Sequence, residues 1–169
     1  PTNHWYGLAL RPRIIVWNTA SLQRDKLPHP PRSLEDLKDP RFAAKGVGIA
    51  NPAFGTTRSH LAASLAALGR KEFSELLSAI PFKIYDGNAA VVRAVATGEV
   101  DIGLTDFDDL VAGQEQGWPL DGQPIRLRSE ESAILCIPGT IALIDRPAAD
   151  EQTRRNTRQF VDYILPRGG

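Results

Sequence analysis

Short apolar runs alternate with amphipathic segments along the chain. The run 13–17 is β-branched and apolar, and it predicts a buried strand. Three further strand-like runs follow at 46–50, 82–85 and 100–104, and each leads through a polar or glycine turn into a segment with apolar residues at helical spacing. Strands that alternate with helices predict an α/β sheet with helices on both faces.

The predicted helices are bounded by residues that end helices. Leucines recur at helical spacing over 56–68, and Gly69 predicts the end of that helix. A second apolar face follows at 73–80. The last helix is predicted at about 148–165, with four apolar residues on its inward face. These residues are Phe160, Val161, Ile164 and Leu165.

Two strand-like runs precede this last helix, at 133–137 and 140–144. Pro138-Gly139 lies between them and predicts a break, since neither residue favours the interior of a strand. The sequence therefore predicts two separate strands here.

Composition and charge argue against several classes of protein. The 169 residues carry 20 basic and 20 acidic side chains, whereas a nucleic-acid-binding protein usually has a basic excess. The longest apolar runs have the length of strands, so no membrane-spanning helix is expected. Cys136 is the only cysteine, which excludes an intrachain disulfide and a cysteine-based zinc cluster. Because the chain begins at Pro1 and contains no methionine, we expect a piece of a longer protein, and any export signal would lie upstream of it.

Three strand-to-helix turns carry the candidate chemistry, at 51–57, 86–88 and 105–109. In open α/β sheets, ligands bind in the crevice outside the carboxyl ends of the strands, so these turns are predicted to line one edge. Gly55-Thr56-Thr57 at a helix start suits an anion, although a threonine there can simply cap its own helix. Gly87-Asn88 also forms a turn that needs no ligand.

The third turn is acidic. Asp106-Phe107-Asp108-Asp109 places three carboxylates in four residues, and such clusters suit hard cations such as calcium, magnesium or ferric iron. The alternative is that Asp106 caps the helix while the other two interact with its dipole. His60 lies in the preceding helical segment and is expected to be a packing or surface residue. No catalytic motif is present, and we expect no enzymatic activity.

Several separated stretches agree with one family. They include Ile15-Val-Trp-Asn18, Gly48-Ile-Ala-Asn-Pro52, Gly103-Leu-Thr-Asp106 and Ile137-Pro138-Gly-Thr-Ile-Ala-Leu143. Together they resemble the substrate-binding proteins of ABC importers, in the type II periplasmic binding fold, nearest the ferric-iron-binding branch. The resemblance extends over almost the whole chain in the order of the family.

The resemblance implies an open mixed sheet with helices on both faces, forming a single lobe of a two-lobed protein. Residues 1–18 would be the entering hinge strand region, 19–138 the solute-binding lobe, and 139–169 the returning hinge strand with the C-terminal helix. Ile14–Val16 and Thr140–Leu143 would then run beside each other as hinge strands. The first lobe of the same protein would be missing from this chain.

The implied function is non-catalytic solute capture for an ABC permease, in the periplasm or at the cell surface. The solute would be ferric iron, another cation, a metal chelate or a small organic ion, with no cofactor required and no nucleic acid bound. The alternative is an effector-sensing domain of a transcription regulator with the same fold. The predicted ligand-binding residues are Asn51, Thr56, Thr57, Gly87, Asn88, Asp106 and Asp108, of which Asp106 and Asp108 would bind a metal. Ferric-binding relatives have two adjacent tyrosines where this chain has the 106–109 stretch, which leaves the solute open.

Overall fold

The computed structural model describes residues 5–24, 29–53, 55–128, 133–144 and 146–165. Residue contacts divide the chain into two units, a larger one of Arg11–Ile137 and a smaller one of Pro1–Leu10 with Pro138–Gly169. Within the described ranges, no helix has both the length and the apolar character needed to cross a membrane.

A mixed sheet forms the centre of the larger unit. Its path is β3-β2-β4-β1-β5, and β6 also pairs with β1. The strands are β1 (Trp5–Asn18), β2 (Val47–Ala50), β3 (Phe82–Tyr85), β4 (Ile102–Asp106), β5 (Leu120–Pro124) and β6 (Cys136–Ala142). β2 is parallel to both β3 and β4, whereas β1 is antiparallel to β4 and β5. The predicted open mixed sheet is therefore confirmed.

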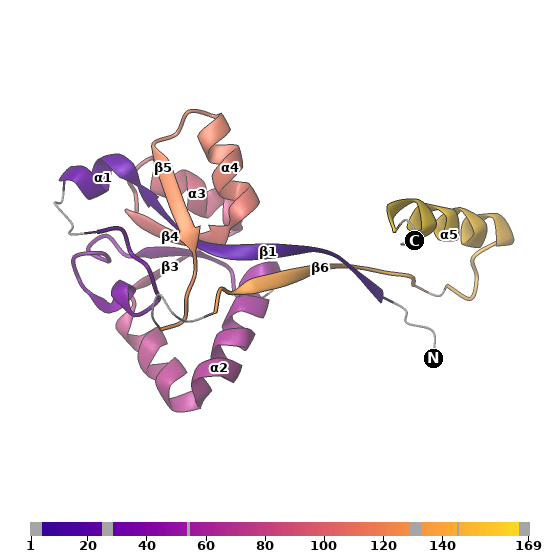
Figure 1. Ribbon diagram of the computed structural model, residues 1–169, viewed down its shortest axis with the longest axis horizontal. Coiled ribbons are helices and arrows are strands. Elements are labelled where there is room, and N and C mark those ends of the chain that lie inside the picture. The colour runs from indigo at the N-terminus through magenta and orange to yellow at the C-terminus, as the bar shows by residue number, and fades with distance from the viewer. Residues whose placement is uncertain (1–4, 25–28, 54, 129–132, 145, 166–169) are drawn as a thin grey trace. The chain divides into compact units, whose positions relative to one another are not determined.

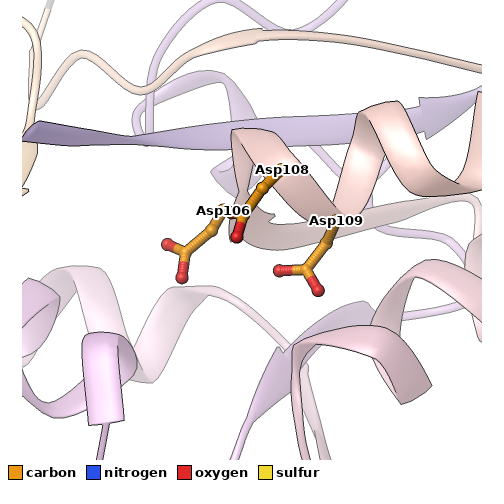
Figure 2. Close-up of side chains that lie close together, drawn as sticks. All are labelled: Asp106, Asp108 and Asp109. Atoms are coloured by element: carbon orange, nitrogen blue, oxygen red, sulfur yellow. The ribbon is translucent and has the colours of Figure 1, made fainter. Parts of the chain in front are cut away.

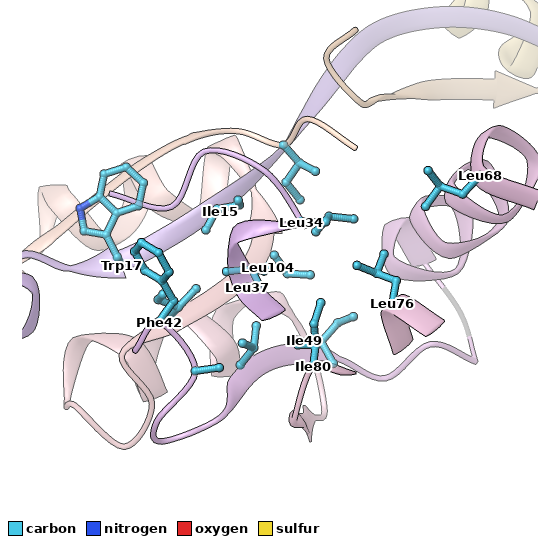
Figure 3. Close-up of a cluster of buried hydrophobic side chains, with 14 residues drawn as sticks. Ile15, Trp17, Leu34, Leu37, Phe42, Ile49, Leu68, Leu76, Ile80 and Leu104 are labelled. Atoms are coloured by element: carbon cyan, nitrogen blue, oxygen red, sulfur yellow. The ribbon is translucent and has the colours of Figure 1, made fainter. Parts of the chain in front are cut away.

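Helices cover both faces of this sheet, as predicted (Figure 1). The helices of the larger unit are α1 (Thr19–Arg24), the 3₁₀ turn η1 (Asp36–Lys38), α2 (Gly55–Ala79), α3 (Asn88–Ala96) and α4 (Phe107–Glu115). Successive side chains of β1 point to opposite faces of the sheet, so alternate residues pack in different cores. Ile15 and Trp17 pack in a core with residues of η1 and α2 (Figure 3), and Ile14 and Val16 pack in a second core with residues of α3 and α4.

Helix α2 changes direction at Gly69, as its sequence predicts. Gly69 has φ 76° and ψ 164°, which is non-helical and lies in a region that favours glycine. The two predicted helices, 56–68 and 73–80, are thus the two arms of α2. Leu68 and Leu76, one on each arm, both reach the core under the sheet.

Helix α3 lies very close to β4. A Cβ atom placed on Gly103 would meet Val91 Cγ1 at 2.5 Å and Val95 Cγ2 at 3.1 Å. Because these valines are buried on the inner face of α3, the approach of helix to strand depends on the missing side chain at Gly103.

Two elements of the larger unit were not predicted. α1 follows directly after β1, where the sequence indicated a loop. β5 has the sequence Leu-Asp-Gly-Gln-Pro, without the alternation of a strand, and it forms because its backbone pairs with β1 from Ile14↔Pro124 to Asn18↔Leu120.

The predictions for the returning strand are wrong in two respects. β6 runs without a break from Cys136 to Ala142, through Pro138-Gly139. Ile14–Val16 has β4 on one side and β5 on the other, so residues 140–143 cannot lie beside it. β6 pairs with β1 nearer its start, where an added Cβ on Gly139 would lie 3.6 Å from the Ala9 carbonyl oxygen.

The smaller unit contains α5 (Glu151–Ile164), which begins where the Asp150 carboxylate accepts a hydrogen bond from Thr153 N at 2.6 Å. Of the predicted inward face of this helix, Val161 is buried. Phe160 is 57% exposed and Tyr163 is 84% exposed, which corrects the inward placement of Phe160. This unit therefore presents large apolar side chains to solvent.

Candidate functional site

A buried ion pair joins the two central strands at the edge where the predicted turns lie. The antiparallel register of β1 and β4 places Arg13 directly opposite Asp106. Arg13 Nη1 lies 2.6 Å from Asp106 Oδ1, and the side chains are 0% and 3% exposed. Cross-strand neighbours of opposite charge attract, and burial strengthens the attraction while removing hydration from both groups.

Two further helix starts converge on the same carboxylate. Thr56 Oγ1, in the first turn of α2, donates to Asp106 Oδ2 at 2.7 Å, and Asn88 Nδ2, at the start of α3, donates to the same oxygen at 2.9 Å. The Arg13 guanidinium also donates to Thr56 Oγ1 at 3.2 Å and to the Leu104 carbonyl at 3.3 Å. The turns after β2, β3 and β4 are therefore joined through Asp106.

The predicted residues divide into two groups by position. Thr56, Asn88 and Asp106 lie within hydrogen-bond distance of one another. Thr57 is buried on α2, and Asn51 Oδ1 accepts from Ala53 N at 2.9 Å. The two remaining residues lie at helix starts: Gly87 is the N-cap residue of α3 and Asp108 is in the first turn of α4. Solute binding by these residues stays a prediction.

The capping interpretation is wrong for Asp106. This residue occupies the N-cap position of α4, yet its side chain makes no capping hydrogen bond and instead binds Arg13, Thr56 and Asn88. These three hydrogen bonds use three of the roughly four lone-pair positions of the carboxylate, which leaves about one for a metal ion.

Three carboxylates gather where β4 passes into α4 (Figure 2). One oxygen each from Asp106, Asp108 and Asp109 lies within 4.8 Å of the others. Asp108 is exposed, while Asp109 accepts from Thr105 Oγ1 at 3.2 Å. Burial, and then the charge of Asp108, raise the pKa of Asp109. Asp109 was not among the predicted site residues, although it stands in the same acidic stretch.

Tyrosine is the usual iron ligand of the ferric branch by the resemblance above, and the three tyrosines of this chain are Tyr6, Tyr85 and Tyr163. Tyr85 belongs to the larger unit, and its hydroxyl donates to Glu99 Oε1 at 2.8 Å. Burial, with the Glu99 hydrogen bond, raises the pKa of Tyr85 to about 12. A phenolate at this position is therefore disfavoured, and carboxylates are the available anionic ligands near the Arg13–Asp106 pair.

Sequence reasoning missed Arg13 as a site residue. The signal was present, because Arg13 is the charged residue at the head of a run of buried β-branched positions. A charge in such a place needs a partner of opposite sign. The partner was not identifiable from spacing, since Asp106 lies 93 positions further along the chain.

His60 is buried on the inner side of α2, as a packing residue would be. Burial, and then the positive charge of Arg13, lower the pKa of His60 to about 3. The imidazole is therefore neutral at physiological pH.

Comparison with known proteins places the chain in context. No protein-family model matches it. Over 102 residues, or 59% of this chain, the sequence is 35% identical to the Fe(3+)-binding periplasmic protein of Serratia marcescens, and the match covers 29% of that protein. The chain thus matches less than a third of this curated relative.

Solved structures share the fold over nearly the whole chain. Iron-bound HitA from Pseudomonas aeruginosa matches 97% of this chain with a TM-score of 0.75 at 24% identity, and 51% of HitA is covered. The periplasmic binding protein AfuA from Actinobacillus pleuropneumoniae, with exogenous fructose-6-phosphate bound, matches 96% of this chain with a TM-score of 0.72 at 20% identity, and 49% of AfuA is covered.

The chain accordingly spans about half the length of these structures. The fold of this chain matches about half of each of these binding proteins, and its sequence is similar to that of a Fe(3+)-binding protein. The chain therefore has the fold of about half of a periplasmic binding protein, and its sequence is similar to that of a Fe(3+)-binding periplasmic protein over 59% of its length.

Proposed function

We propose that the chain is the solute-capture lobe of a substrate-binding protein that serves an ABC importer, in the periplasm or at the cell surface. One observation carries the proposal: three strand-to-helix turns, in a chain related to a Fe(3+)-binding periplasmic protein, are joined at the buried Asp106. Ligands of open α/β sheets bind at such an edge. The relatives are binding proteins by name, which supports capture without catalysis.

The proposed solute is ferric iron, a metal chelate or a small organic ion. For a cation, the exposed Asp108 and the half-buried Asp109 supply carboxylate oxygens beside the engaged Asp106. Hard cations prefer such oxygen ligands. We therefore move the proposed metal ligands from the predicted pair Asp106 and Asp108 to Asp108 and Asp109, with Asp106 fixing the turn that carries them.

The proposed mechanism is hinge closure of two lobes around the solute. β1 and β6 are paired strands that both cross between the two units of the chain, at 10–11 and 137–138. We propose that these strands lead to a first lobe, with 1–18 and 139–169 as the hinge region and 19–138 as the capture lobe. The closed form would then be presented to a membrane permease.

Calorimetric titration with ferric nitrilotriacetate tests the proposed site. We expect heat of weak binding from the wild-type chain, and its loss in Asp108→Asn and in Asp109→Asn. Asp162→Asn, which removes an exposed carboxylate of α5, is the matched control and is expected to bind as the wild type does. Unchanged binding in both site variants would refute the assignment of these ligands.

The variant Asp106→Ala is a poor test of the same site. Loss of the Asp106 carboxylate would leave the Arg13 guanidinium buried without its counter-ion, which destabilises the fold. A binding defect in that variant would therefore not distinguish a lost ligand from a disturbed lobe.

A further inference from the structure

Strand β1 changes its neighbouring strand at Arg13. Its pairing with β4 reaches back to Arg13↔Asp106, and its pairing with β5 reaches back to Ile14. The Arg13 N–H donates to the Leu135 carbonyl oxygen at 2.8 Å, whereas the Arg13 carbonyl oxygen accepts from Ile125 N at 2.8 Å. Leu135 N donates in turn to the Ile125 carbonyl oxygen at 3.1 Å. These three residues, Arg13, Ile125 and Leu135, form a fork at which β6 replaces β5 beside β1.

The fork lies next to the places where the chain passes between its two units. β1 crosses at 10–11 and β6 crosses at 137–138. In the described pairings, β1 and β6 there pair with each other and with no third strand. Pro12 and Pro138 lie beside the two crossings, and proline lacks the N–H that a ladder hydrogen bond needs. A ribbon with few hydrogen bonds opens more easily than the sheet, so bending is expected just outside the fork.

The side chain of Arg13 joins the fork to the edge that is proposed to bind solute. Its guanidinium is buried and pairs with Asp106 at 2.6 Å. The same carboxylate accepts hydrogen bonds from Thr56 and Asn88. Groups that share one hydrogen-bond and ion-pair network influence the stability of one another. A change in the contacts of Asp106 is therefore expected to reach the fork through Arg13.

We infer that Arg13 anchors the hinge: it holds the fork from which both crossing strands leave, and it couples the stability of the fork to the contacts of Asp106. Arg13 is thus a positioning residue for the crossing strands. Its part in solute capture rests on the proposed hinge closure, because a solute that alters the contacts of Asp106 then alters the fork as well. The coupling is measured without solute, so its failure and a failure of the proposed solute site are separate results.

Native-state hydrogen exchange, followed by nuclear magnetic resonance, compares the wild-type chain with Asp106→Asn. Asparagine keeps the shape of aspartate but removes the charge that pairs with Arg13. We expect the amide hydrogens of Ile125 and Leu135 to exchange about tenfold faster in the variant, a factor that corresponds to about 1.4 kcal/mol. Unchanged exchange at both amides would overturn the inference.

The amide of Asn18 is the internal reference, because it lies at the other end of β1. It donates to the Asp101 carbonyl oxygen at 3.1 Å. We expect its exchange rate to change by less than about twofold in Asp106→Asn, since local opening at the fork does not include it. Global unfolding exposes every amide. Equal acceleration at Asn18 and at the fork would therefore show a loss of overall stability and would contradict the coupling.

Lys45→Met is the matched control variant, because it breaks an ion pair beside the opposite end of β4. Lys45 Nζ lies 3.0 Å from Asp101 Oδ1, one residue before β4 begins. This variant is expected to leave the exchange rates of Ile125 and Leu135 at their wild-type values. If it accelerates them as much as Asp106→Asn does, the fork does not depend specifically on Asp106 and the inference fails.

Thr56→Val decides the case in which Asp106→Asn does not fold. Valine has nearly the shape of threonine but lacks the hydroxyl that donates to Asp106 Oδ2 at 2.7 Å. A larger acceleration at Ile125 and Leu135 than at Asn18 supports the inference. The same change at all three amides, or no change, refutes it.

Discussion

Arg13 and Asp106 face each other across two antiparallel strands and form an ion pair at 2.6 Å that solvent hardly reaches. The pair lies at the junction of three turns, so it holds together the edge of the sheet proposed to bind solute. Its partners come from β1, α2, α3 and β4. The geometry of this edge therefore depends on one buried arginine.

Replacing Arg13 by methionine should destabilise the fold strongly. The substitution keeps an unbranched side chain but leaves Asp106 buried without its counter-ion, and breaking such a pair from one side costs about 3–5 kcal/mol. Urea unfolding measures the loss as a lower midpoint at an unchanged slope.

The control for this prediction is Arg41→Met. Arg41 pairs with Asp39 at 2.6 Å, but its side chain is 64% exposed, and exposed pairs contribute about 0–1 kcal/mol. Equal losses of stability in the two variants would contradict a special role for the buried pair.

The free energy of unfolding should fall as the pH is lowered from about 6.5 toward 3, in part because of His60. The folded state keeps this histidine neutral, with a pKa of about 3, whereas the unfolded chain takes up a proton near its ordinary pKa of 6.5. The unfolded state therefore binds more protons over this range, and stability rises with pH by up to about 1.4 kcal/mol per pH unit from this group.

Comparing the wild type with His60→Gln isolates this contribution. Carboxylates titrate in both proteins, so the difference between their stability curves reports the histidine. Above about pH 6.5, the ordinary pKa of histidine, the difference in free energy of unfolding between the wild type and His60→Gln is expected to be constant. Below this pH, the free energy of unfolding of the wild type is expected to fall relative to that of the variant. Parallel curves over this range would show that His60 is not buried as a neutral group.

Gly103→Ala should destabilise the larger unit by about 1–3 kcal/mol, as overpacking of a core usually does. The added methyl group would meet Val91 Cγ1 at 2.5 Å, which forces α3 away from β4. Gly87→Ala is the control, because Gly87 has an extended backbone and no atom within 4 Å of an added Cβ. Thermal unfolding should show a lower midpoint for Gly103→Ala alone.

Ferric nitrilotriacetate should bind the isolated chain only weakly. If a second lobe supplies as little as about 4 kcal/mol of contacts, its absence lowers affinity by roughly a thousandfold. A ligand of micromolar affinity would then bind with millimolar affinity. Calorimetry on this chain, and on a chain extended by an upstream lobe, makes the comparison, and submicromolar binding by the chain alone would refute the two-lobe mechanism.

Elements with a strong local signal could be predicted from the sequence. The strand at 82–85 coincides with β3, and the bend of α2 falls at the predicted Gly69. In both cases neighbouring residues determine the backbone. Apolar periodicity and a glycine that tolerates positive φ are local features, so a single sequence is sufficient to locate them.

Elements that depend on distant pairing could not be predicted. β5 contains Gly122 and Pro124 and becomes a strand only because β1 lies beside it. β6 continues through Pro138-Gly139 for a similar reason, since it pairs with β1. Tertiary hydrogen bonds override local preference in both strands.

The candidate site also combines features that neighbouring residues determine with features that depend on distant strand pairing. Thr56, Asn88 and Asp106 were identified because each follows a strand end, which the sequence pattern locates. The identity of their partner was not accessible, because a single sequence contains no information on the register that sets Arg13 opposite Asp106. The contacts of Asp106 with Arg13, Thr56 and Asn88 were accordingly not anticipated, and the alternative that its side chain caps α4 is wrong.

The central position of β1 has a consequence for the order in which the chain folds. Its buried residue Ile14 pairs with Thr105 on one side and Pro124 on the other, and the nearer partner lies 91 residues later (105 − 14). At a synthesis rate of about 5–20 residues per second, this apolar strand emerges from the ribosome about 5–20 seconds before either neighbour exists. During that interval Ile14–Trp17 is an unpaired, strongly apolar segment. Exposed apolar surface and unpaired strand edges favour aggregation, so Ile14–Trp17 is an aggregation-prone part of the nascent chain until β4 arrives and pairs with it.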